Sequence, residues 1–143
     1  MNSLLWLPLA ALSAVFAALV AIFGKIGVTG IDTTLSTTVR AAFMFGFLLI
    51  ASIVMGKLGG VGTIPGRTML FIALSGLAGA ASWFFYFWAL KVGQATQVAT
   101  IDRFSLVIVM VLSAVFLGEN IGWQSGFGAL LVTAGAIMIS LAK

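Results

Sequence analysis

Three ionisable residues, Arg40, Asp102 and Arg103, interrupt long apolar stretches of the chain. Charged side chains inside a membrane cost free energy and commonly mark functional sites. Asp102 and Arg103 are adjacent, so on a helix their side chains point about 100° apart and do not readily neutralise each other. Arg40 and Asp102 are expected at a similar depth, which makes a buried Arg40–Asp102 pair the natural hypothesis. The alternative is that the charges snorkel to the membrane surface, which suits the long Arg103 better than the short Asp102.

A run of six aromatic residues, Trp83–Trp88, supplies the second group of candidates. At helical spacing, Trp83, Tyr86 and Gly79 share one face, which would line a pocket with an indole N–H and a phenol O–H. Aromatic residues near the end of a span more often form the belt at the membrane surface, which suits Tyr86 and Trp88. Helix packing is the commoner role for Trp83, so both interpretations stay open.

Two lysines, Lys25 and Lys91, lie at the ends of the first and third apolar stretches. They are interpreted as anchors at the membrane surface, or as cations that attract an anion to the entrance of a cavity. Glu119 falls in the short turn Gly118–Asn120 on the opposite side of the predicted bundle, where we expect it to be solvated.

The composition sets the class of protein that must position these residues. Of 143 residues, 62% are hydrophobic and 7% are charged, and the mean hydropathy is +1.26. Soluble domains are about half apolar and about a quarter charged, so a soluble globular fold is excluded. The chain has no Cys and no His, which excludes disulfide scaffolds, His/Cys metal sites, thiol nucleophiles and Ser-His triads. No cofactor is expected. The seven Lys and Arg residues are scattered singly, so nothing indicates nucleic acid as a partner.

Five apolar stretches are long enough to cross a bilayer as helices, for which roughly 20 residues are needed. They are Trp6–Phe23, Leu35–Met55, Met69–Leu90, Val98–Leu117 and Ile121–Leu141. Helices are favoured over a membrane barrel because the apolar residues occur in blocks rather than alternating. No Lys or Arg precedes the first stretch, so it is interpreted as a retained helix rather than a signal peptide. The predicted fold is an all-α bundle of five transmembrane helices in a single domain, residues 1–143.

One connection is predicted to be a loop, and the fourth span must be longer than its apolar run. The segment Gly56–Arg67 is rich in Gly and contains Pro65, which is typical of a loop. In the fourth span, the uninterrupted apolar run Phe104–Leu117 has 14 residues, or roughly 21 Å at 1.5 Å per residue. Because the hydrocarbon core of a bilayer is about 30 Å thick, this span must extend back past Asp102 and Arg103.

The distribution of positive charge gives a weak orientation signal. Because successive spans alternate in direction, Lys25, Lys91 and Lys143 share one side, and Lys57 and Arg67 share the other. The positive-inside rule orients a protein by the difference between its two sides, and this difference is small. We therefore predict insertion in both orientations and an antiparallel homodimer whose halves reproduce an inverted repeat. If Arg40 and Arg103 also count, the alternative is a fixed orientation with the N-terminus outside.

Several segments resemble a known family. Ser82–Leu90, Val98–Val107 and Phe116–Glu119 are similar to the third span, the start of the fourth span and the F-L-G-E turn of EamA-type proteins, in the drug/metabolite transporter superfamily. Ala21–Gly27 and Arg40 also resemble family positions. The resemblance covers nearly the whole chain and is to the short bacterial and archaeal members with five spans. In this family the residue after the F-L-G-E turn is more often Arg or Lys, whereas in this chain it is Asn120. The missing positive charge makes the orientation signal weaker still.

The resemblance implies that this chain is half of a transporter, because longer members carry two such repeats in opposite orientations around a central cavity. It favours a homodimeric secondary transporter in the cytoplasmic membrane of a bacterium or archaeon, with a small metabolite or amphipathic compound as substrate and alternating access as its mechanism. The alternative is an accessory protein or a subunit of a lipid-carrier flippase, which would contact membrane lipid and a protein partner.

The candidate substrate and coupling residues are Asp102, Arg40, Arg103, Trp83 and Tyr86, with Lys25 and Lys91 at the cavity entrance. In this hypothesis Asp102 exchanges a proton or another cation, and Arg40 is its counter-ion. A membrane-embedded enzyme is poorly supported, because Asp102 is the only acidic residue placed at membrane depth.

Overall fold

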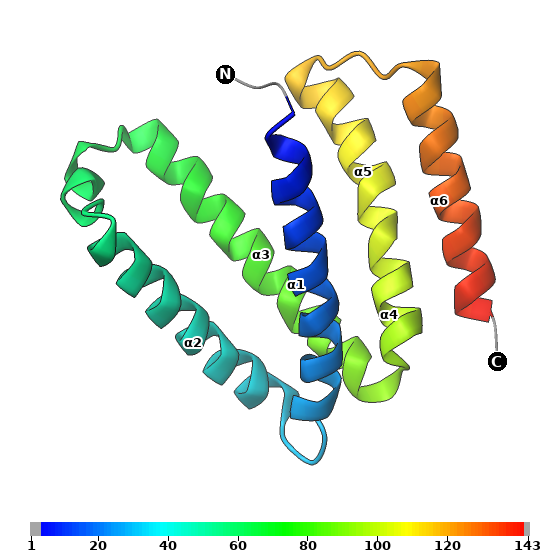
Figure 1. The fold of residues 1–143 in the computed structure, drawn as a ribbon, viewed down its shortest axis with the longest axis horizontal. Helices are drawn as coiled ribbons and strands as arrows, with labels where there is room; N and C mark the ends of the chain where they lie inside the picture. The colour runs from blue at the N-terminus through cyan, green and yellow to red at the C-terminus, as the bar shows by residue number, and fades with distance from the viewer. Residues whose placement is uncertain (1–3, 142–143) are drawn as a thin grey trace. The chain divides into compact units, whose positions relative to one another are not determined.

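The computed structural model describes residues 4–141 and is all-helical, with no strand among those residues. Its α-helices are α1 (Trp6–Gly27), α2 (Thr33–Val54), α3 (Gly66–Val92), α4 (Ala95–Ile101), α5 (Ser105–Leu112) and α6 (Trp123–Leu141) (Figure 1). Five segments are long and apolar enough to cross a membrane: α1, α2, α3, the composite segment Ala95–Leu117 and α6. The prediction of an all-α fold with five transmembrane helices is confirmed. Lys143, which enters the predicted charge balance, lies outside the described residues.

Local capping chemistry sets the ends of α2. The helix begins where the side chain of Asp32 accepts a hydrogen bond from the backbone N–H of Leu35 at 3.0 Å, as an N-cap residue does. It ends at Val54, and the following Gly56 has a φ of 64°. This left-handed conformation favours glycine just after a helix.

The predicted loop Gly56–Arg67 is only partly irregular. Leu58–Thr63 forms a 3-10 helix, and α3 begins at Gly66, directly after Pro65. Arg67 therefore lies in the first turn of α3 and not in the connection, which corrects the sequence interpretation. Proline is compatible with a helix start because the first backbone N–H groups of a helix have no partner within it.

The fourth span extends back past Asp102 and Arg103, as its length requires, but it is not one continuous α-helix. Its parts are α4, a 3-10 turn (Asp102–Phe104), α5 and a π-helical turn (Ser113–Leu117). Short 3-10 and π segments inside a helix often mark a hinge or a functional site. The π-helical turn ends at Gly118, whose φ of 67° reverses the chain toward α6.

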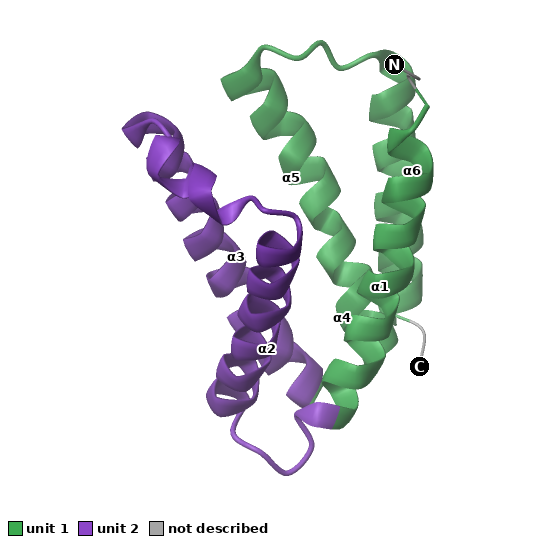
Figure 2. Cartoon of the chain, turned by 60° about the vertical axis from the view of Figure 1, so that its left-hand side comes forward, with its two compact units in different colours: residues 1–26, 92–143 green, residues 27–91 purple. Residues whose placement is uncertain are grey.

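The chain divides into two compact units, coloured separately in Figure 2. Unit 1 comprises Met1–Ile26 and Val92–Lys143, and unit 2 comprises Gly27–Lys91. In unit 1, α4 packs along α6, whose Ala129 and Ala136 are buried. In unit 2, the buried apolar side chains include Phe87 and Leu90, near the C-terminal end of α3 and 2% and 0% exposed.

Most large apolar side chains of the described residues are exposed, including Phe43 and Phe47 on α2 and Met138 on α6. Soluble monomers rarely expose contiguous apolar surface on this scale. Five apolar spans with outward-facing Phe, Leu, Ile and Val side chains are instead what a helical protein surrounded by lipid requires. The protein is therefore a multi-pass membrane protein.

Candidate functional site

Arg40 and Trp83 are brought together within unit 2. Arg40 lies in α2, and the Cζ atom of its guanidinium is 3.7 Å from the ring centroid of Trp83 in α3. The ring centroid of Phe87 is 5.1 Å from the same Cζ atom. A guanidinium over an indole face is attracted by the ring quadrupole, by about 0.5 kcal/mol in water and about 2 kcal/mol when desolvated. Arg40 and Trp83 are both half-buried, so the stronger part of this range applies.

Trp83 also contacts the rings that follow it on α3. Its ring centroid is 5.6 Å from that of Tyr86, with an edge-to-face angle of 75°, and 5.9 Å from that of Phe87. These contacts follow from helical spacing, because residues three and four apart are neighbours on a helix surface. The predicted shared face of Trp83 and Tyr86 is thus observed. Phe87 was missed by the sequence reasoning, although its position four residues after Trp83 is a signal that could have found it.

The one carboxylate side chain of unit 2 caps helix α2 and does not pair with Arg40. Asp32 is the single acidic residue in the sequence between Gly27 and Lys91, and it caps the first turn of α2 through the N–H of Leu35. Within its own unit, the charge of Arg40 therefore faces aromatic rings and has no carboxylate partner. The guanidinium has five N–H donors in one plane, and a ring stacked on its face leaves those in-plane donors for other acceptors.

Asp102 and Arg103 occupy the 3-10 turn that divides the fourth span, and both side chains are exposed in the isolated chain. The structure thus places both charges at an irregular point of the backbone, which the sequence reasoning did not foresee. Arg40 belongs to unit 2 and Asp102 to unit 1, so the Arg40–Asp102 pair stays a prediction.

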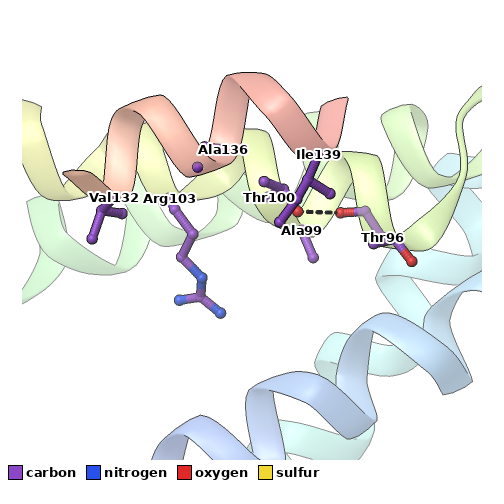
Figure 3. A pocket seen from close by; sticks show the side chains of 8 residues that line it. Thr96, Ala99, Thr100, Arg103, Val132, Ala136 and Ile139 are labelled. Carbon is purple, nitrogen blue, oxygen red and sulfur yellow. Dashed lines mark hydrogen bonds between the residues drawn. The ribbon is translucent and has the colours of Figure 1, made fainter. Parts of the chain in front are cut away.

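A groove of about 380 Å³ lies between α4 and α6 in unit 1 (Figure 3). Its lining consists of Thr96, Ala99, Thr100 and Arg103 from the fourth span and Val132, Gly135, Ala136 and Ile139 from α6. Thr96, Thr100 and Arg103 are spaced by four and three positions, which places them on one helical face. The hydroxyl of Thr100 donates to the Thr96 carbonyl at 2.6 Å. Arg103 is the one charged residue of this lining.

The two lysines predicted at a cavity entrance each contact a loop of their own unit. In unit 1, Nζ of Lys25 donates to the backbone carbonyl of Gly93 at 2.7 Å. In unit 2, Nζ of Lys91 donates to the carbonyl of Ile31 at 3.2 Å. Both contacts tie the last turn of a helix to a connection, which gives each lysine a structural role. Their role at an entrance stays a prediction.

Known proteins are similar in sequence to this chain over nearly its full length. Residues 4–141 match the EamA-like transporter family. The chain belongs to this family. A relative from Sinorhizobium sp., named an uncharacterized transporter in the cobO 3' region, is 43% identical over 138 residues, which are 95% of this chain and 96% of the relative. No solved structure matches the chain significantly.

Membership of the EamA-like family confirms the resemblance seen in the aromatic third span, the fourth span and the following turn. The protein is accordingly a membrane transporter with a small-molecule substrate. The two groups of candidate residues in this EamA-family chain differ in character. In unit 2, Arg40 lies over the rings of Trp83 and Phe87, and Tyr86 contacts both rings. In unit 1, the interrupted fourth span contributes Arg103 to the lining of an open groove.

Proposed function

We propose that this EamA-family protein is a secondary transporter that works as an antiparallel homodimer and moves a small metabolite or amphipathic compound by alternating access. The observation that carries the proposal is the 3-10 turn Asp102–Phe104, which interrupts a membrane span and bears a carboxylate. Secondary transporters typically build their substrate and ion sites from interrupted helices near the middle of the bilayer. An ionisable residue at membrane depth is costly, which favours a functional role for it.

Asp102 and Arg40 lie at matching positions in their spans, which supports a coupled role. Asp102 follows Ala95, the first residue of α4, by seven positions, and Arg40 follows Thr33, the first residue of α2, by the same number. At 1.5 Å per residue, each is roughly 10 Å from the start of its span. The second and fourth spans start on the same side of a membrane because successive spans alternate. In the proposed cycle, Asp102 binds a proton or another cation on one side and releases it on the other, and Arg40 balances its charge in the substrate-free state.

The proposed dimer is supported by helix faces that lie open. Gly76 on α3, and Gly128 and Gly135 on α6, have no atom within 4 Å of the position that a Cβ would take. Small residues let the helices of membrane proteins approach closely, so these faces suit contact with a second copy. The Sinorhizobium relative has nearly the same length and is named a transporter, which fits a transporter assembled from two five-span chains.

The coupling role is tested with purified protein in liposomes that contain a pH-sensitive dye. A thermal-shift screen of metabolites supplies a ligand, and its addition outside should move protons across the membrane with the wild-type protein. Asp102→Asn should abolish this proton movement and still bind the ligand, because the amide has no proton to exchange. Glu119→Gln is the matched control, since it removes a carboxylate from a turn outside the spans. Wild-type proton movement by Asp102→Asn would refute the role of Asp102.

The antiparallel arrangement is tested by labelling from the two sides of the membrane. The chain has no Cys, so Gly62→Cys in the 3-10 helix Leu58–Thr63 introduces a single reactive site into a connection. A membrane-impermeant thiol reagent should label about half of the protein in intact cells and the rest after lysis. Complete labelling, or none, before lysis would show one fixed orientation and overturn the antiparallel dimer.

A further inference from the structure

We propose that Arg40 and Trp83 form a binding site for the carboxylate of the transported substrate, and that this substrate is an aromatic monocarboxylate. The inference rests on the proposed transport function and names the substrate class of that site. It starts from unit 2 alone, where α2 supplies a cation and α3 supplies the rings that hold it.

The geometry leaves the binding edge of Arg40 available. Its guanidinium carbon lies over the ring of Trp83, 3.7 Å from the centroid, and over that of Phe87, 5.1 Å from the centroid, so its contacts in unit 2 are with rings and not with a carboxylate. The N–H donors point outward in the guanidinium plane, in the fork geometry that matches the two oxygens of a carboxylate. Trp83 and the buried Phe87 restrict the rotamers of the side chain, which reduces the entropy lost when a ligand binds.

The charges of unit 2 favour an anion as the ligand. The sequence from Gly27 to Lys91 holds four cationic residues and one acidic residue, and the acidic residue, Asp32, is engaged as the N-cap of α2. A cation in a low-dielectric span lacks the solvation that it has in water, so an anion that reaches it gains more than it would at a surface. The in-plane donors of Arg40 favour a carboxylate over a neutral amide because hydrogen bonds between opposite charges are about twice as strong.

The surroundings of Arg40 favour an aromatic body on this anion. Trp83 and Tyr86 are half-buried and present ring edges and faces rather than further charges. One turn before Trp83 on the same face is Gly79, and no atom lies within 4 Å of where its Cβ would be. Because Gly79 has no side chain, the surface of α3 one turn before Trp83 is open. A flat apolar group fits such an open surface and packs against aromatic rings with favourable energy.

The site is tested by equilibrium binding, which does not depend on transport. Isothermal titration calorimetry of the protein in nanodiscs compares phenylacetate, 3-phenylpropionate and 4-phenylbutyrate with their three amides. At least one acid should bind wild-type protein about 10- to 100-fold more tightly than its amide. Arg40→Gln should remove this preference and leave the weak affinity for the amide unchanged. Arg67→Gln, which removes a cation from the first turn of α3 in the same unit, should preserve the preference.

Two further variants keep the test decisive if Arg40→Gln does not fold. Arg40→Lys retains the charge without the planar fork and should reduce the preference for the acid. Gly79→Leu leaves Arg40 intact and covers the open surface of α3 one turn before Trp83, so it should weaken binding of the acid and of the amide alike. Equal affinity of every acid and its amide for wild-type protein would overturn the inference, as would a full preference retained by Arg40→Lys together with unchanged binding by Gly79→Leu.

Asp102→Asn separates this inference from the proposed transport function. If Arg40 binds the substrate, the variant should keep the preference for the acid even though it no longer couples proton movement to transport. If wild-type protein shows no preference and Asp102→Asn still loses coupling, the carboxylate site is wrong and the transport proposal stands. If the preference depends on Arg40 while Asp102→Asn transports normally, the proposed coupling role is wrong and the carboxylate site stands.

Discussion

The stacking of Arg40 on Trp83 predicts a measurable coupling between two helices. The perturbation is a double-mutant cycle with Arg40→Met, Trp83→Leu and the double variant. Each single change has several effects, because Arg40→Met also removes the cost of a charge in the membrane and Trp83→Leu also removes the ring contacts to Tyr86 and Phe87. The cycle cancels these separate effects and leaves the pairwise term.

The expected magnitude follows from the geometry. A distance of 3.7 Å from Cζ to the ring centroid is close contact, and both side chains are half-buried. We therefore expect a coupling of about 1–2 kcal/mol, in the upper part of the range for cation–π pairs. Arg40→Met alone is expected to cost less than this coupling, or even to stabilise the protein, because it removes a charge from a span.

Reversible unfolding in mixed micelles, with the free energy extrapolated for each of the four proteins, measures the coupling. The matched control is the cycle Arg67→Met with Trp88→Leu, which also pairs an arginine and a tryptophan of unit 2 but lies at opposite ends of α3. Its coupling should be close to zero. A coupling below about 0.3 kcal/mol for Arg40 and Trp83, equal to that of the control pair and within the additivity expected for independent sites, would refute the stacking argument.

Two local features of the backbone give further predictions. Asp32→Ala removes the acceptor of the 3.0 Å hydrogen bond from the N–H of Leu35, so it should lower the free energy of unfolding by about 1 kcal/mol, whereas Asp32→Asn should cost less. Gly118→Ala places a Cβ at a φ of 67° and should cost about 1 kcal/mol, with Gly122→Ala as the control in the same connection. Unfolding titrations check both, and an unchanged midpoint for Asp32→Ala or Gly118→Ala would contradict the cap or the strain.

The five spans could be predicted from the sequence because each needs only a long apolar block, and such blocks have no stable alternative to a helix inside lipid. The boundaries were less predictable. Leu58–Thr63 forms a 3-10 helix in a segment whose Gly and Pro content is typical of a loop. Local propensity does not distinguish a 3-10 turn from irregular chain when the same residues favour both.

The charged residues could be identified from the sequence, but their structural surroundings could not. Arg40, Asp102 and Arg103 were identified because each is costly in an apolar span, which is a property of the residue alone. The break at Asp102–Phe104 was not foreseen, since no Gly or Pro marks it in the sequence. The stacking of Arg40 on Trp83 depends on the register between α2 and α3, and register between helices is a tertiary property that one helix's periodicity does not contain.

The energy balance at Arg40 argues that this residue does more than join two helices. An arginine costs up to about 2.5–3.5 kcal/mol in a span on insertion scales, the value at the span's centre, and the contact with Trp83 returns about 2 kcal/mol when desolvated. Its own unit offers no carboxylate to make up the difference, since Asp32 caps α2. An apolar side chain would make a purely structural contact with Trp83 at lower cost. In the same way, replacing a buried ion pair by apolar residues is often neutral or stabilising. An anion that reaches the guanidinium offsets part of the remaining cost, and this is the state that a carboxylate-binding transporter must favour.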